Sequence, residues 1–216
     1  MNLLRAGGLL SLLVFQPALA DITPETHPLL DEFVSDMQTL QGRFEQSLVD
    51  ADGRVMEVTR GTLQINRPDR FRWTYSDPYE QHLIADGANI WSYDVDLAQV
   101  TVKPQLEALA NTPALLLGGA DDALDQFDYE GGFSRDTVEW VQLAPKNTES
   151  GFLRVELGFV DGTISQMVFY DHLDQTTLVN LFDVSVNRPI DPARFEFVPP
   201  DDVDVVGTPA AEETAP

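Results

Sequence analysis

The sequence predicts a mainly β fold of the α+β class, in which one curled antiparallel sheet leaves an apolar hollow covered by short helices. Three observations support this prediction: runs of alternating apolar and polar residues, Asp-Gly pairs between those runs, and only two or three short helical segments. Alternation with a period of two is typical of strands with one buried face. Asp-Gly favours hairpin turns because glycine accepts positive φ. About ten strands then form a meander, and a sheet of that size curls strongly.

The first helix is expected over 28–40 and ends at Gly42. One face of this segment carries apolar residues with the i, i+3, i+4, i+7 spacing of an amphipathic helix, namely Leu30, Phe33, Val34, Met37 and Leu40.

A second helix is expected in the middle of the chain. Thr112 is the residue type that caps a helix, and Pro113 suits the first helical position. The apolar residues that follow are Leu115, Leu116 and Leu117, and Gly118-Gly119 ends the run. A further short helical turn is expected over 121–127.

The strands are expected in eleven runs of the chain after Gly42. Asp52-Gly53, Asp86-Gly87 and Asp161-Gly162 stand between such runs. The runs are 43–49, 61–66, 70–75, 81–86, 90–94, 99–103, 137–143, 152–159, 164–171, 176–187 and 194–198.

The two ends of the chain are expected to lie outside the fold. Residues 1–20 read as a cleaved signal peptide, because Arg5 precedes the apolar run Leu9 to Phe15 and Ala18-Leu19-Ala20 resembles a cleavage site. Residues 21–206 are expected to form a single exported domain. Residues 207–216, rich in Pro, Ala and Glu, are expected to be disordered.

Charge and cysteine content narrow the function classes. The chain has 36 Asp and Glu against 13 Lys and Arg, a net charge of −23. Such a surface repels nucleic acid, so partners are expected to present basic or apolar patches, although the charge could equally serve solubility alone. The chain has no cysteine, so it has no disulfides and no site for the acyl chains of a bacterial lipoprotein.

Large aromatic residues suggest the wall of the hollow. They are Phe71, Trp73, Tyr75, Trp91, Tyr93, Trp140 and Phe159. The same side chains could instead fill an ordinary core with no hollow, and composition alone favours that interpretation.

No enzyme or metal signature accompanies this pattern. His27, His82 and His172 are scattered without metal-ligand spacing, and the nucleophile-elbow, P-loop and zinc-protease motifs are missing. We therefore expect no catalytic activity, no metal and no cofactor.

Six motifs in order resemble the outer-membrane lipoprotein carrier family, LolA. They run over nearly all of 28–205: Phe44-Glu45-Gln46, Asn66-Arg67-Pro68 with Phe71 and Trp73, Asp86-Gly87 with Trp91 and Tyr93, Asn111-Thr112-Pro113, Asp161-Gly162-Thr163-Ile164, and Phe195 to Pro200. Each motif is weak alone, and the order makes the resemblance specific.

The resemblance implies a fold, a function and site residues. The fold is an incomplete antiparallel barrel whose apolar cavity is covered by a helical lid. Members accept triacylated lipoproteins from an inner-membrane ABC transporter and pass them to an outer-membrane receptor, so a non-enzymatic, monomeric carrier in the periplasm is expected. The receptor shares the fold but needs an anchoring cysteine, which this chain lacks.

The resemblance also assigns roles to particular residues. Arg67 is expected to hold the lid shut by donating hydrogen bonds to lid carbonyls, a role that suits a planar, permanently charged guanidinium; a solvated strand-end arginine is the simpler alternative. The acyl-chain cavity is expected to be lined by Leu63, Ile65, Phe71, Trp73, Trp91 and Tyr93. The lid is expected to consist of Leu30, Phe33, Val34, Met37, Leu115, Leu116 and Leu117.

Two other functions fit the same fold. One is a carrier of a phospholipid or glycolipid, since an acyl-lined hollow reads the same for either cargo. The other is a periplasmic stress sensor that binds acylated or misfolded protein.

Overall fold

The described residues form one large sheet. The computed structural model describes residues 27–105, 126–147 and 151–210. Within these ranges twelve strands lie in the order β12-β6-β5-β4-β3-β2-β1-β11-β10-β9-β8-β7. All neighbouring pairs are antiparallel except β12 and β6, which are parallel.

The elements follow one another in a simple order along the chain. They are α1 (Pro28–Asp36), β1 (Thr39–Val49), β2 (Val55–Asn66), β3 (Arg70–Asp77), β4 (Gln81–Asp86), β5 (Asn89–Asp94), β6 (Gln99–Pro104), β7 (Phe127–Arg135), β8 (Val138–Pro145), β9 (Phe152–Val160), β10 (Thr163–Asp171), β11 (Thr176–Val186), the 3₁₀ helix η3 (Pro192–Phe195) and β12 (Asp204–Gly207).

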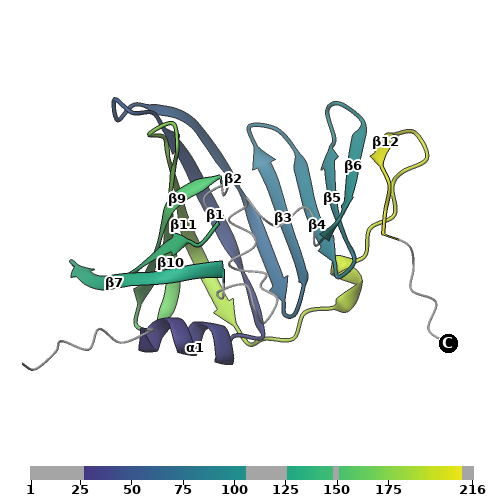
Figure 1. Cartoon of the computed structure of the whole chain (residues 1–216). Coiled ribbons are helices and arrows are strands. Elements are labelled where there is room, and N and C mark those ends of the chain that lie inside the picture. Colours follow the sequence, from purple (N-terminus) through teal and green to yellow (C-terminus); the bar gives the residue numbers. More distant parts are fainter. Residues whose placement is uncertain (1–26, 106–125, 148–150, 211–216) are drawn as a thin grey trace, which may run out of the picture.

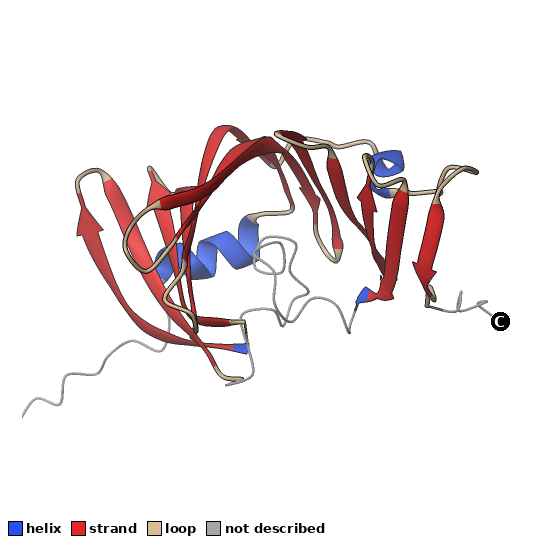
Figure 2. Cartoon of the chain, turned by 90° about the horizontal axis from the view of Figure 1, so that it is seen from above, coloured by secondary structure: helices blue, strands red, loops and turns tan. Residues whose placement is uncertain are grey.

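The sheet curls around α1 without closing into a barrel. Figure 1 shows the strands in sequence across the molecule, with α1 at one end of the strands. Figure 2 shows the molecule from above, so that the view runs roughly along the strands, and the helix lies inside the curve of the sheet. The prediction of a mainly β, incomplete antiparallel barrel is confirmed.

The two faces of the sheet have different coverings. We call the concave face, which carries the main apolar cluster and α1, the inner face, and its opposite the outer face. The cluster on the inner face draws on both halves of the sheet, from Leu63 and Trp73 on one side to Leu157 and Phe169 on the other. The curl therefore brings strands that are far apart in the sheet around one apolar volume.

The helix α1 is shorter than the sequence predicted. It ends at Asp36, Met37 has extended backbone, and the sheet begins at Thr39, so Leu40 and Gly42 belong to β1. Leu40 lies opposite Ile65 of β2 and Val186 of β11. Its apolar spacing fits the helix pattern, but pairing with two strands determines its conformation.

The last predicted strand, 194–198, is wrong. Pro192–Phe195 form η3, whose N-terminus is capped by Asp191 with a proline just inside. Phe195 is buried, and Phe197 packs against Trp91 and Tyr93 on the outer face. The alternation of Phe195 and Phe197 reflects packing of an irregular segment across the sheet.

The C-terminal boundary also differs from the prediction. Gly207, expected to begin a disordered tail, ends β12 and lies opposite Val102 of β6. This parallel strand was not expected in a meander. Residues 208–210 are described beyond it, and the rest of the predicted tail, like the predicted signal peptide, lies outside the described residues.

The sequence did not reveal β7. Phe127, expected at the end of a helical turn, is its first residue, while the rest of that turn lies outside the described residues, apart from Gln126 directly before the strand. The Gly131-Gly132 pair interrupts the alternation, and the register shifts between Tyr129 and Gly131. A bulge of this kind disturbs the period-two pattern by which strands are recognised.

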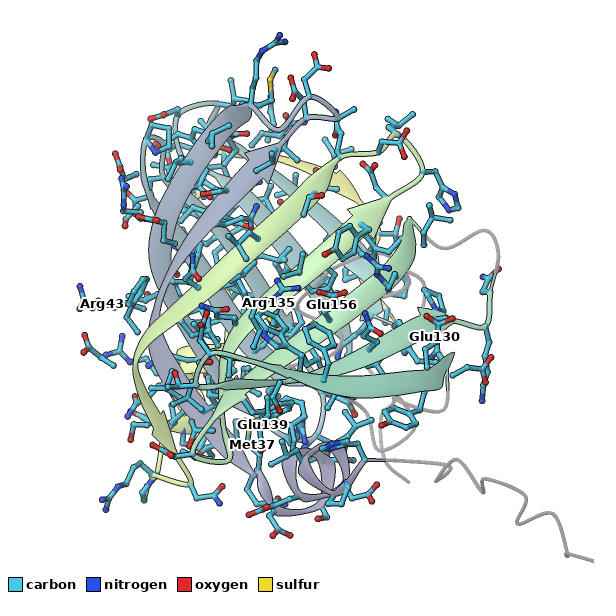
Figure 3. The ribbon with its side chains drawn as sticks, turned by 90° about the vertical axis from the view of Figure 1, so that its left-hand side faces the viewer. Met37, Arg43, Glu130, Arg135, Glu139 and Glu156 are labelled. Carbon is cyan, nitrogen blue, oxygen red and sulfur yellow. The ribbon has the colours of Figure 1, made fainter. Side chains whose placement is uncertain are left out.

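A buried carboxylate ties three strands together on the outer face. Glu156 of β9 is only 6% exposed and accepts hydrogen bonds from Gln142 Nε2 (2.8 Å) and the Tyr170 hydroxyl (3.2 Å). Arg154 Nε lies 3.4 Å from the Glu156 carboxylate, and its guanidinium lies 4.1 Å from the centre of the Tyr170 ring. Figure 3 shows Glu156 among the strands on this side of the molecule. The cluster therefore links β8, β9 and β10.

Replacing this carboxylate should weaken the fold. Glu156→Ala leaves several covered donors without an acceptor, so we expect a loss of about 2–3 kcal/mol in the free energy of unfolding, measured by urea denaturation. Glu139→Ala, at an exposed glutamate of β8, is the matched control and should change it by less than about 0.5 kcal/mol. Equal effects of the two substitutions would contradict this assignment.

Candidate functional site

Two neighbouring strands build one wall of an enclosed apolar surface. Leu63 of β2 lies opposite Trp73 of β3, and Ile65 opposite Phe71. Directly opposed residues share a face of the sheet, and all four are at most 3% exposed and belong to the inner-face cluster. The structure therefore brings these four predicted cavity residues together.

The helix α1 covers this wall. Leu30, Phe33 and Met37 are buried in the same cluster, and Val34 packs against it. The Phe33 ring meets Phe159 of β9 edge-on, with 5.8 Å between the ring centroids. The four described lid candidates thus face the inner wall, and Phe33 reaches across to the opposite half of the sheet.

Aromatic side chains continue the wall along β1 and β3. Phe44 lies 4.6 Å from Trp73 and 5.3 Å from Tyr75 between ring centroids. Burial raises the pKa of Tyr75 to about 12, because ionisation would place a charge in apolar surroundings. This region is therefore a poor environment for charge.

Arg67 joins the end of β2 to the last turn of α1. Its Nη1 donates to the carbonyl oxygens of Phe33 (2.8 Å) and Val34 (3.0 Å), and its guanidinium lies 4.8 Å from the centre of the Phe33 ring. The last turn of α1 has no basic residue of its own. Arg67 thus satisfies carbonyls that a helix leaves unpaired at its C-terminus and places a positive charge at the negative end of the helix dipole.

Asn187 holds the same end of α1 from the other side. Its Oδ1 accepts from the backbone N–H of Gln38 at 2.8 Å, and its Nδ2 donates to the carbonyl of Asp36 at 2.9 Å. Its own N–H donates to the carbonyl of Thr39 at 2.8 Å. Asn187 has φ 55°, a left-handed conformation that asparagine tolerates. The helix end is therefore clasped between β2 and β11.

Sequence reasoning missed Asn187 because its partners lie about 150 positions earlier in the chain. The only local signal is an asparagine at the end of the long strand predicted over 176–187. That pattern suggests a strand end, and it says nothing about which segment the amide would meet.

The start of α1 has a side-chain cap, and a gap lies beside its last turns. His27 Nδ1 caps the start by accepting from Leu29 N–H at 3.3 Å, and the His27 ring lies 6.1 Å from Tyr129 of β7. A gap of ≈ 210 Å³ lies between the last turns of α1 and the β9–β10 turn, lined by residues that include Phe33, Asp36 and Asp161. The helix therefore packs incompletely against that turn.

Three predicted wall aromatics lie on the outer face instead. Trp91 lies opposite Ile84, which lies opposite Arg72, so Trp91 points away from Phe71. Trp91 and Tyr93 pack on Phe197, with 5.6 and 5.9 Å between ring centroids. We therefore leave Trp91 and Tyr93 out of the candidate site.

Trp140 is the third of these aromatics. It stacks on Phe133 of β7 with ring centroids 6.0 Å apart, while its neighbour Val141 belongs to the inner cluster. Tyr75 and Phe159, by contrast, lie on the inner face, as predicted.

The other three predicted lid residues, Leu115, Leu116 and Leu117, lie outside the described ranges. Within those ranges no group of three or more His, Asp or Glu is placed to hold a metal ion, and no helix is long and apolar enough to cross a membrane.

The sequence matches a known family over most of its length. The family model described as "Outer membrane lipoprotein carrier protein LolA" matches residues 35–198. Two relatives are each called "Outer-membrane lipoprotein carrier protein". The relative from Nitrosomonas europaea is 38% identical over 178 residues, which cover 82% of this chain and 86% of the relative. The relative from Halorhodospira halophila is 41% identical over 177 residues, which cover 82% and 83%.

A solved structure shares the fold. An uncharacterized conserved protein from Thermus thermophilus aligns with a TM-score of 0.51 and 15% sequence identity, covering 82% of this chain and 96% of that one. At this identity the likeness concerns the fold alone.

Removing the Asn187 amide should loosen α1. Asn187→Gly keeps the left-handed backbone but loses the side-chain bonds to Asp36 and Gln38. We expect amide hydrogen exchange over 30–40 to become about fivefold faster, the equivalent of about one hydrogen bond. Asn187→Asp retains the acceptor for Gln38 N–H, so its exchange rate should lie between those of the unmodified chain and Asn187→Gly. Unchanged exchange in Asn187→Gly would show that this end of the helix does not depend on the amide.

Proposed function

The chain belongs to the outer membrane lipoprotein carrier protein family LolA, and we propose from this that it is a non-enzymatic periplasmic chaperone that carries acylated lipoproteins to the outer membrane. Its cargo is triacylated lipoprotein, received from an inner-membrane ABC transporter and delivered to an outer-membrane receptor. The acyl chains occupy the inner face beneath α1.

One observation supports this proposal most strongly. The main apolar cluster, on the inner face of the sheet, is covered by a nine-residue helix whose last turn is held by polar contacts from Arg67 and Asn187. A helix of this length is marginal by itself in water. Such a cover can be displaced without unfolding the sheet, which is paired independently of it.

The apolar energies favour displacement by an acyl chain. Exposing acyl chains to water costs about 0.8 kcal/mol per CH₂, or tens of kcal/mol for three chains. The buried apolar side chains of this segment, Leu30 and Phe33 of α1 and Met37 directly after it, contribute about 1.5–3 kcal/mol each. Cargo therefore gains more from the inner face than α1 loses by leaving it.

The competition between helix and cargo explains release without a nucleotide. Part of the gain from burying acyl chains is spent on breaking the contacts of α1, so the net affinity is lower than that of an open cavity. A receptor that binds the acyl chains more tightly then accepts the cargo downhill. Arg67 acts as the latch whose strength sets this difference.

Weakening the latch should trap cargo. Arg67→Leu removes two hydrogen bonds from a charged donor, each worth about 1.5–3 kcal/mol, so we expect release to receptor-bearing vesicles to slow at least about tenfold. The measurement is native mass spectrometry of the carrier, purified from the periplasm, before and after mixing with those vesicles. Arg67→Lys keeps the charge without the planar fork and should be intermediate.

Arg43→Leu is the matched control. Arg43 is an exposed arginine of β1 paired with Asp183, at the outer surface and away from α1 (Figure 3). It should release cargo like the unmodified chain. Normal handover by Arg67→Leu would remove the latch from the mechanism, and free phospholipid or glycolipid in place of lipoprotein would show a carrier of another lipid.

A further inference from the structure

The end of the sheet opposite α1 has an unusual surface. We call it the far rim: residues 50–56, 77–80, 94–98 and 171–175, which are the β1–β2, β3–β4, β5–β6 and β10–β11 turns with the strand residues that adjoin them, at the upper ends of the strands in Figure 1. An exposed large apolar side chain lies in or directly beside each turn: Val55 and Met56 at the start of β2, then Tyr79, Leu97 and Leu173 in the other three turns, respectively.

The opposite end lacks this feature. Among the described residues, the turns at the α1 end are 67–69, 87–88, 136–137, 161–162 and 187–191, and none carries an exposed large apolar side chain. The remaining large apolar residues exposed on the structure lie in strands or in the C-terminal segment: Leu153, Phe182, Val198, Val205 and Val206. Exposed apolar turns therefore belong to one end of the sheet.

Two of these turns do not need their apolar side chains. Leu97 N–H donates to the carboxylate of Asp94 at 3.0 Å, and Leu173 N–H to Asp171 at 2.8 Å. In each turn the aspartate carboxylate accepts a backbone N–H and so fixes the turn. The other positions of such turns are usually occupied by polar residues or glycine. Leu97 and Leu173 are 70% and 73% exposed, so their side chains contribute little to the fold.

Negatively charged side chains surround the exposed apolar residues of the far rim. The far rim carries eight carboxylates, Asp50, Asp52, Asp77, Glu80, Asp94, Asp96, Asp171 and Asp174, against one arginine, Arg54. Arg54 is itself paired with Asp52 at 3.0 Å. A surface of this kind repels a second copy of itself and an anionic membrane.

We propose that the far rim is a docking surface for a protein partner whose contact face is apolar and basic. The β10–β11, β1–β2, β3–β4 and β5–β6 hairpins are successive neighbours in the sheet. The turns of adjacent hairpins lie two strand spacings, or about 10 Å, apart, so the four turns together extend over about 30 Å. That length suits an interface of ordinary size. On the proposed function, which this inference deepens, the partner is one of the two membrane proteins that load or unload the carrier.

The position of the rim has a functional consequence. A partner bound at the far rim leaves α1, Arg67 and Asn187 uncovered, because they lie at the opposite end of the strands. The helix can then move while the partner stays bound. Apolar tips supply the contact energy, and the carboxylates supply steering and orientation.

The first test removes the apolar side chains. The rim variant combines Met56→Ser, Leu97→Ser and Leu173→Ser, all at positions at least 62% exposed, so folding should be retained. The control variant removes three exposed apolar side chains away from the rim: Phe182→Ser, Val198→Ser and Val206→Ser.

Binding is measured by flotation with three sets of neutral phosphatidylcholine vesicles, carrying the transporter, the receptor or no protein. We expect the rim variant to lose about tenfold or more of its binding to at least one protein-bearing set, and the control variant to bind like the unmodified chain. Binding of the rim variant to both protein-bearing sets at the level of the unmodified chain would overturn the proposal. So would binding of the unmodified chain to neither set, or equally to protein-free vesicles.

A second pair of variants tests the charge. Asp96→Asn with Asp174→Asn removes two carboxylates from the rim, and Asp136→Asn with Asp161→Asn removes two from turns at the α1 end. Only the rim pair should lower the association rate with the protein-bearing vesicles and make that rate depend less on salt concentration. Identical salt dependence of the two pairs would contradict the basic partner.

Failure of the docking surface and failure of the proposed function are separable. Native mass spectrometry of the purified chain reports cargo independently of vesicle binding. Bound lipoprotein together with an unaffected rim variant would refute the docking surface alone. Rim-dependent binding with no acylated cargo would refute the carrier function alone.

Discussion

The structure depends on one constraint: a single sheet has an apolar inner face that no second sheet covers. Curling brings the two halves of the sheet towards each other but does not close the gap between them. A short helix completes the enclosure, with Phe33 touching Phe159 on one half and its carbonyls held by Arg67 from the other. Among the described residues, the inner face is therefore covered by a short element that adds its own apolar side chains to the cluster and is fixed at its end by polar contacts.

The outer face is closed differently, and the contrast supports the assignment of the site. Ile84, Trp91 and Val102 of β4, β5 and β6 lie on the same side as the C-terminal segment, whose Phe195 and Phe197 are packed there. That segment then pairs as β12 along β6, so strand hydrogen bonds anchor it. The outer covering is built into the sheet, whereas α1 is clasped only at its end. Displacement is therefore expected on the inner face alone.

Periodicity predicted most strands and the first helix because each needs only local information. Periodicity did not predict which face of the sheet a side chain lies on, because that depends on the register between strands. Trp91 and Trp73 look equivalent in sequence, yet the pairing of β3, β4 and β5 places them on opposite faces. Phe195 and Phe197 imitate a strand because they alternate, although a capped proline turn begins the segment. Family resemblance supplied Arg67, and nothing local could supply Asn187, whose partners become neighbours only after β1 and β11 pair.

The most direct test of the account uses the three tryptophans, of which Trp73 alone lies on the inner face. Trp91→Phe with Trp140→Phe leaves Trp73 as the only emitter, and Trp73→Phe with Trp140→Phe leaves Trp91. Each variant is loaded with lipoprotein whose acyl chains carry bromine, which quenches fluorescence only on close approach. The account predicts strong quenching of Trp73 and none of Trp91. Quenching of Trp91, or unquenched Trp73 in a loaded carrier, would show that the acyl chains do not lie beneath α1.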